Sequence, residues 1–115
     1  MDLEKQVLSD EFKFKLESLS EDMLIDVLIT GLSLKEVSGS RQEKISQIIE
    51  FQKEAMKPII EYLGKNNINI KNTAELFGMI YANMHPYQII DLAKQEYVNS
   101  IDEDVEIRHA KKLLY

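Results

Sequence analysis

Two histidines and a run of three carboxylates are the side chains in this sequence best suited to chemistry. Nucleophilic catalysis needs a base beside the nucleophile and a third group that orients the base. Neither His85 nor His109 lies in a glycine-framed or otherwise preorganised segment, so we interpret them as a helix-start residue and a tail residue. The run Asp102-Glu103-Asp104 lacks the glycine-turned loop of alternating oxygen ligands that calcium sites use. We therefore expect this acidic run to be a solvated or partner-facing end of a strand.

Composition excludes several other functions. The chain has no cysteine and no glycine-rich phosphate loop, and its two histidines are far apart, so we expect no metal and no cofactor. Phe77, Tyr81 and Tyr97 are aromatic residues of the kind that stack on RNA bases. However, 20 acidic residues against 14 basic ones give a net charge of −6, which argues against nucleic acid and anionic membranes. No apolar stretch approaches the roughly 18 residues that span a bilayer. We predict a protein that is not an enzyme and has neither a nucleic-acid nor a membrane partner.

The spacing of apolar residues predicts the elements of the first half of the chain. Three- and four-residue steps predict an amphipathic helix over Ser9–Leu19, and strict alternation predicts a strand over Met23–Thr30. Leu24 and Leu28, on the second face of that strand, are expected to have partial cover from the first helix. A long helix is predicted over Arg41–Leu63, begun by a Ser40 cap and ended by a left-handed Gly64. Pro58, inside that helix, predicts a kink or a break.

The second half predicts two further strands, a short helix and a last strand. Ile68–Asn72 alternates as a short polar strand of the edge type, and Leu76–Met84 has the apolar and aromatic content of a central strand. Gly78 within it predicts a bulge or a close backbone approach. Pro86 opens the short helix, at a position where its missing N–H costs nothing. The last strand is predicted over Val98–Ile107.

The order of these elements after the first helix is strand, helix, strand, strand, helix, strand. This order predicts an α+β, ferredoxin-like βαββαβ fold, with two helices on one face of an antiparallel four-stranded sheet. The other face of such a sheet must be solvated or hold a partner. We divide the chain into an N-terminal helical leader (1–22), a central domain (23–107) and a C-terminal tail (108–115).

The tail ends in an unusual way. A polar linker, Arg108–Lys112, leads to Leu113, Leu114 and Tyr115, which have no following residues to pack against. Chain ends are usually frayed and polar, so an apolar, aromatic end needs an explanation. The tail either binds a partner or folds back on the domain.

From Met84 onward the residues resemble the propeptides of subtilisin-type serine proteases. The resemblance rests on a run with that family's spacing: Met84, His85-Pro86, Ile89, Leu92, Val98, Ile101, Asp102 and Asp104. Gln52–Leu63 is similar to the family's first helix, and Ser9–Leu19 and Asp22–Ile29 are similar to the leader helix and first strand of bacterial members. The catalytic motifs of the protease itself, Asp-Thr/Ser-Gly, His-Gly-Thr and Gly-Thr-Ser, are absent from the sequence.

The resemblance implies a propeptide that acts as intramolecular chaperone and inhibitor, with a subtilisin-like catalytic domain as its partner. It implies that the open sheet face packs on two surface helices of the protease. Asp102 and Asp104 would then accept hydrogen bonds from the N-termini of those helices. The tail would lie in the substrate cleft as an added strand. Tyr115 would fill the primary specificity pocket, and Leu114, Leu113 and Lys112 the preceding subsites.

Four departures from the family pattern bear on these expectations. His85 replaces the usual Thr, Ser or Asn cap, which predicts a weaker start to the short helix. Asp102 stands where Glu is commoner and has a shorter reach. The linker before Tyr115 is a few residues longer than in compact members, and Lys112 occupies a subsite that is often apolar.

Two alternatives stay open beside the propeptide. The chain is a standalone inhibitor that acts in trans, or it is a ferredoxin-like protein-interaction module without a protease partner. The N-terminus has no basic region followed by an apolar run, so no signal peptide is visible. We expect a cytoplasmic protein if the sequence is a complete gene product, and otherwise the location of the parent protease.

Overall fold

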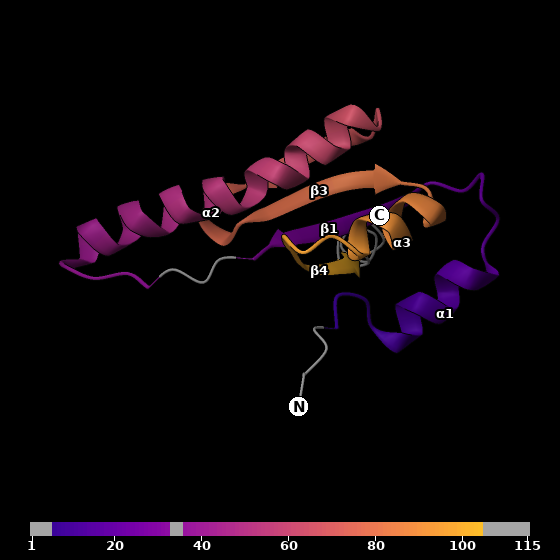
Figure 1. Cartoon of the computed structure of the whole chain (residues 1–115), viewed down its shortest axis with the longest axis horizontal. Helices are drawn as coiled ribbons and strands as arrows, with labels where there is room; N and C mark the ends of the chain where they lie inside the picture. The colour runs from indigo at the N-terminus through magenta and orange to yellow at the C-terminus, as the bar shows by residue number, and fades with distance from the viewer. Residues whose placement is uncertain (1–5, 33–35, 105–115) are drawn as a thin grey trace, which may run out of the picture.

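The computed structural model describes residues 6–32 and 36–104. Its four strands form one antiparallel sheet in the order β2-β3-β1-β4. The elements are α1 (Asp10–Ser18), β1 (Ile25–Gly31), α2 (Arg41–Lys65), β2 (Asn69–Ala74), η1 (Glu75–Phe77), β3 (Met79–Met84), α3 (Pro86–Ala93) and β4 (Val98–Glu103). This arrangement confirms the predicted ferredoxin-like α+β fold (Figure 1).

The core lies between the sheet and the helices. Alternate residues of β1, Ile25, Val27 and Ile29, are buried, as the strict alternation of the sequence predicts. They share one cluster with the buried side of α2, and the two remaining helices and the other strands contribute the rest of it. The further members are Leu8, Phe12, Leu16, Met56, Ile59, Leu63, Ile68, Ile80, Ala82, Met84, Ile89, Leu92, Val98 and Ile101.

The leader is built into this core. Ser9 caps α1 by accepting a hydrogen bond from the Phe12 backbone N–H at 3.1 Å, and Phe12 and Leu16 are buried. The backbone N–H of Ile101 donates to the carbonyl of Val7 at 3.0 Å, so the segment before α1 lies along the outer edge of β4. In Figure 1, α1 lies beside α3. Of the two residues expected to have partial cover, Leu28 is half-buried, whereas Leu24 is 52% exposed.

Helix α2 is continuous at Pro58, where the sequence predicts a kink or a break. It runs from Arg41 to Lys65 through this residue, so the predicted break is wrong. Losing one helical hydrogen bond costs about 3 kcal/mol. Burial of Met56, Ile59 and Leu63 contributes about 1.5–3 kcal/mol for each side chain and outweighs that cost.

The end of α2 is also different from the prediction. Gly64 lies inside the helix, and the left-handed residue is Asn67, with φ of 55°. Asparagine tolerates this conformation better than most residues, so the left-handed turn forms at Asn67, three residues after Gly64. Ser40, by contrast, caps the helix as predicted, accepting a hydrogen bond from the Glu43 backbone N–H at 3.2 Å.

The strand predicted over Leu76–Met84 is wrong in its first part. The residues before Gly78 form the short 3-10 helix η1, and β3 begins only at Met79. Gly78 has φ of 63°, and a Cβ atom there would lie 2.2 Å from Oε1 of Gln52. This glycine therefore provides both the left-handed turn and the close approach of α2. Gly78 lies directly between the end of η1 and the start of β3.

The ends of the other strands differ by small amounts. The strand predicted from Met23 begins at Ile25, and Met23 is 46% exposed. β1 ends at Gly31, one residue after the predicted Thr30, and a Cβ atom on Gly31 would lie 2.6 Å from the Ala55 carbonyl oxygen of α2. The last strand ends at Glu103, and the predicted extension over 105–107 lies outside the described residues.

Candidate functional site

The face of the sheet opposite the core carries a set of side chains arranged in rows across the strands. On β1 these are the even-numbered residues and on β3 the odd-numbered ones, because alternate residues point to opposite faces. In the middle row Leu28 lies between Tyr81 of β3 and Asp102 of β4. Leu28 and Tyr81 are half-buried and Asp102 is exposed. We call this surface the open face.

The open face has an apolar centre. Leu28 and Tyr81 are cross-strand partners, and Met79, two residues from Tyr81 and on the same face, is also half-buried. Such side chains on adjacent strands are close enough to form a continuous strip. An apolar centre with polar residues around it is the usual composition of a protein–protein interface.

One side of this centre is a hydrogen-bonded polar row. Asp26 Oδ1 accepts a hydrogen bond from Asn83 Nδ2 at 2.9 Å and lies 2.5 Å from Nζ of Lys71. Lys71 lies at the register shift between Ile70 and Asn72 of the edge strand β2. The Asp26 carboxylate is therefore already bound within the chain.

The opposite side is a row of hydroxyl groups. Thr30 Oγ1 and Ser100 Oγ are 2.5 Å apart and are cross-strand partners in β1 and β4. Asn99 Nδ2 also donates to Thr30 Oγ1 at 3.4 Å. These groups hold the start of β4 against β1 and so fix the position of the carboxylates that follow.

The three consecutive carboxylates point in alternating directions. Glu103 lies opposite the buried Val27, and its Oε1 is 2.5 Å from Nζ of Lys15 in α1. Asp102 is opposite Leu28 on the open face, and Asp104 follows two residues later, with its backbone N–H donating to the Asp26 carbonyl at 2.9 Å. Among the described residues, neither the Asp102 nor the Asp104 side chain has a hydrogen bond or an ion pair.

These two aspartates are the part of the predicted site that the structure brings together. Among the described residues their carboxylates have no hydrogen bond or ion pair, so they can accept hydrogen bonds from a partner. The remaining predicted residues, Lys112, Leu113, Leu114 and Tyr115, lie outside the described residues. Sequence reasoning missed Met79, which shares the open face with Tyr81 and lies opposite Thr30, because the register of β3 against β1 decides which residues meet.

His85 has a structural role. Its backbone N–H donates to Oε1 of Gln88 at 3.0 Å, and its Nδ1 is 3.0 Å from the Met23 carbonyl oxygen. The hydrogen bond to Gln88 satisfies the His85 backbone N–H at the start of α3. It therefore offsets the weaker helix start that the sequence predicts from His85. His109 lies outside the described residues.

In the described part of the chain, the residues needed for RNA stacking or metal binding do not lie together. Phe77 is on η1 and Tyr97 precedes β4, so only Tyr81 of the three aromatic residues lies on the open face. Over residues 6–32 and 36–104, no three His, Asp or Glu side chains gather as metal ligands. No helix within these ranges has the length and apolar composition needed to cross a bilayer.

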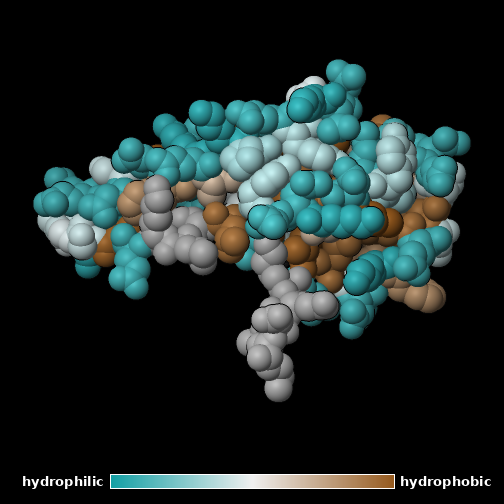
Figure 2. Space-filling model, viewed as in Figure 1, coloured by the Kyte–Doolittle hydropathy of each residue, from teal (hydrophilic) through white to brown (hydrophobic). Residues whose placement is uncertain are grey.

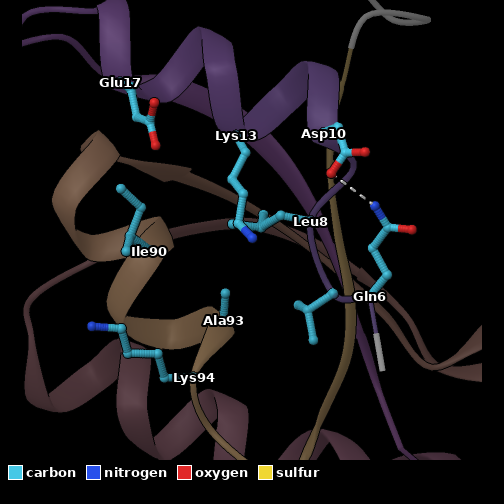
Figure 3. A pocket seen from close by; sticks show the side chains of 9 residues that line it. Gln6, Leu8, Asp10, Lys13, Glu17, Ile90, Ala93 and Lys94 are labelled. Carbon is cyan, nitrogen blue, oxygen red and sulfur yellow. Dashed lines mark hydrogen bonds between the residues drawn. The ribbon is translucent and has the colours of Figure 1, made fainter. Parts of the chain in front are cut away.

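A groove lies between α1 and α3, away from the open face. Its volume is about 530 Å³, and Figure 2 shows apolar surface in this hollow. In Figure 3, Lys13 of α1 points toward α3, which contributes Ile90, Ala93 and Lys94. Asp10 and Glu17 also line the groove, so its charges balance.

A hydroxyl–carboxylate contact joins α2 to α3. The Tyr62 hydroxyl donates to Asp91 Oδ2. Burial, the hydrogen bond and the negative charge of Asp91 together raise the pKa of Tyr62 above its usual value. Burial, followed by the charges of Asp91 and Glu61, raises the pKa of Tyr97 as well.

Comparison with protein-family models, curated proteins and solved structures finds no match to this chain.

Proposed function

We propose that this chain is a propeptide-like inhibitor domain of a subtilisin-like serine protease. The observation that carries the proposal is the position of Asp102 and Asp104. Both are unpaired among the described residues: Asp102 of β4 lies opposite Leu28 of the apolar centre, and Asp104, just after β4, lies beside Asp26. Carboxylates without internal partners are good acceptors for the N–H groups at helix N-termini.

The proposed mechanism has two contacts. The open face packs on two surface helices of the protease, with Asp102 and Asp104 bonded to the N–H groups of their first turns. The tail enters the substrate cleft as an added strand, with Tyr115 in the primary specificity pocket and Lys112, Leu113 and Leu114 in the preceding subsites. Neither contact needs a catalytic residue from this chain, so we propose a non-catalytic role.

The two contacts support one another. Burial of Leu113, Leu114 and Tyr115 contributes about 1.5–3 kcal/mol for each side chain, which is too little for tight inhibition once ordering of the tail is included. Docking of the open face keeps the tail near the cleft and raises its effective concentration there. In cis the same contacts stabilise the two helices of the folding protease, which is the chaperone role.

The proposal is tested by inhibition. Purified chain is titrated against a panel of subtilisin-family proteases that hydrolyse a chromogenic peptide, with chymotrypsin as the control protease. We expect competitive inhibition of at least one subtilisin-family member and none of chymotrypsin beyond slow cleavage. A chain that inhibits no member of the panel contradicts the proposal and favours an interaction module without a protease partner.

A further inference from the structure

The groove between α1 and α3 has the size and the apolar lining of a site for a small molecule. Its volume of about 530 Å³ lies in the range of roughly 300–1,000 Å³ that is usual for ligand pockets. Four apolar residues contribute to its lining: Val7, Leu8, Ile90 and Ala93. Leu8 is buried and the other three are half-buried. A ligand that covers them removes apolar surface from water, which favours binding.

Two charged side chains of α1 line the groove without a partner in the described part of the chain. Asp10 is not one of them, because its Oδ1 accepts a hydrogen bond from Gln6 Nε2 at 3.3 Å. The side chains of Lys13 and Glu17 have neither an ion pair nor a hydrogen bond among the described residues. In a helix, a lysine followed by a glutamate four residues later forms an ion pair less readily than the reverse order does. Both charges can therefore bind a ligand.

Lys13 and Glu17 face the apolar side of the groove. In Figure 3 both side chains extend from α1 toward α3, which contributes Ile90 and Ala93 opposite them. Residues four apart are neighbours on one face of a helix, with their Cβ atoms about 5–6 Å apart. The groove therefore presents an ammonium group and a carboxylate about one helical turn apart, beside apolar side chains.

We infer that the groove binds a free α-amino acid with a large apolar side chain, such as leucine or phenylalanine. The carboxylate of the amino acid pairs with Lys13, its ammonium group pairs with Glu17, and its side chain lies on Ile90 and Ala93. The groove lies away from the open face, so this inference does not rest on the proposed function.

The balance of charges in the groove favours a zwitterion over other small molecules. Two acids, Asp10 and Glu17, and two lysines, Lys13 and Lys94, line it. A simple anion is repelled by the two carboxylates, and a simple cation by the two lysines. An uncharged apolar molecule would desolvate Lys13 and Glu17 without giving either a partner, which costs free energy. A zwitterion provides a partner for each of these charges.

The test measures binding of leucine and of phenylalanine to the full chain by NMR, from the change in amide chemical shifts with ligand concentration. Three molecules related to leucine each lack one of the groups that the inference uses. Isocaproate lacks the ammonium group, isoamylamine lacks the carboxylate, and glycine lacks the apolar side chain. We expect saturable binding of leucine and phenylalanine, with the largest shifts in α1 and α3. Each of the three related molecules should bind at least about fivefold more weakly than leucine.

Two variants of the chain remove one charge each. Lys13→Met and Glu17→Gln should each weaken leucine binding about fivefold. Lys13→Met should not weaken isoamylamine binding, and Glu17→Gln should not weaken isocaproate binding, because each of these molecules lacks the matching group. Lys44→Met, on α2 and outside the groove, is the control and should bind leucine as the unmodified chain does. Urea unfolding checks that each variant is folded.

Three results would overturn the inference. The first is the absence of saturable binding of both leucine and phenylalanine. The second is equal binding of isocaproate and leucine, since the groove would then be a site for simple carboxylates. The third is equal leucine binding by Lys13→Met and the unmodified chain, because the amino acid would then lie elsewhere. None of these measurements involves a protease, so each result leaves the proposed function in place.

Discussion

Lys15 of α1 and Glu103 of β4 form an ion pair, with Nζ and Oε1 2.5 Å apart, across 88 residues of sequence. The Glu103 side chain is 14% exposed and that of Lys15 is 42% exposed. The ion pair engages Glu103, the middle carboxylate of the run Asp102-Glu103-Asp104, on the side of the sheet that faces α1. Strand alternation directs Asp102 to the opposite face, so the leader helix binds the one carboxylate of the run that faces it.

The first prediction concerns this ion pair. Lys15→Ala removes the partner of a largely buried carboxylate and should lower the free energy of unfolding by about 1 kcal/mol. Lys13→Ala, on the same helix, removes an exposed lysine without an ion pair among the described residues and should change stability little. Urea unfolding at low salt measures both. Equal stability of the two variants would show that the pair contributes nothing.

The second prediction separates binding from stability along the acidic run. Asp102→Asn and Asp104→Asn remove charges that have no partner in the described residues, so the free energy of unfolding should change by less than about 0.5 kcal/mol. Each should weaken binding to the protease about tenfold, because a carboxylate bound at a helix N-terminus contributes about 1–2 kcal/mol.

Glu103→Gln is the matched control for this prediction. It should show the opposite behaviour, with lower stability and a smaller change in binding, because Glu103 faces Lys15 instead of the open face. Calorimetric titration and urea unfolding of the three variants give the two quantities. If Asp102→Asn and Asp104→Asn bind as tightly as the unmodified chain, the role of these carboxylates as helix caps is wrong.

The third prediction concerns Gly78. Gly78→Ala places a Cβ atom 2.2 Å from Oε1 of Gln52 at a residue with φ of 63°, and should destabilise the fold by about 1–3 kcal/mol. Adding Gln52→Ala removes the collision but leaves the backbone strain, so the double variant should recover only part of the loss. Full recovery would assign the whole effect to the collision. Thermal unfolding of the single and double variants measures this difference.

The fourth prediction is a dependence on pH. The pKa of Tyr62 is raised in the folded state by burial and by Asp91, so the unfolded chain loses this proton first, near the usual value of 10. The stability that Tyr62 provides is complete below pH 10 and should fall as the pH rises above it. Tyr62→Phe should lower the free energy of unfolding at pH 7 by about 1 kcal/mol and reduce the fall above pH 10.

Urea unfolding between pH 7 and pH 11 measures the effect of Tyr62→Phe. Tyr87→Phe, which removes the hydroxyl of an exposed ring, is the control and should leave the free energy of unfolding at pH 7 unchanged. A Tyr62→Phe variant with the same stability and the same pH profile as the unmodified chain would contradict the prediction.

The starts of the three α-helices and the buried face of β1, which local sequence determines, were predicted correctly. Ser9, Ser40 and Pro86 start helices because their capping chemistry and fixed φ act over three or four residues. The alternation of Ile25, Val27 and Ile29 likewise gives the buried face of β1.

Other features depend on contacts between distant parts of the chain. Packing of α2 on the sheet carries the helix through Pro58, and Gln52 of α2 approaches Gly78 at the point where η1 ends and β3 begins. The resemblance also implied that Asp102 and Asp104 act together when the open face meets a partner. It did not reveal that Leu28 lies between Tyr81 and Asp102 or that Lys15 binds Glu103, because these contacts depend on strand register and on the path of the leader.

The most direct test of the proposed function compares the full chain with a chain that lacks residues 112–115. Both are titrated against the subtilisin-family protease that the full chain inhibits best, and the inhibition constant is measured with a peptide substrate. We expect the shorter chain to inhibit at least a hundredfold more weakly, because burial of three apolar side chains in the cleft is lost. Its urea unfolding curve should match that of the full chain. Equal inhibition by the two chains would contradict the proposal that the tail occupies the substrate cleft.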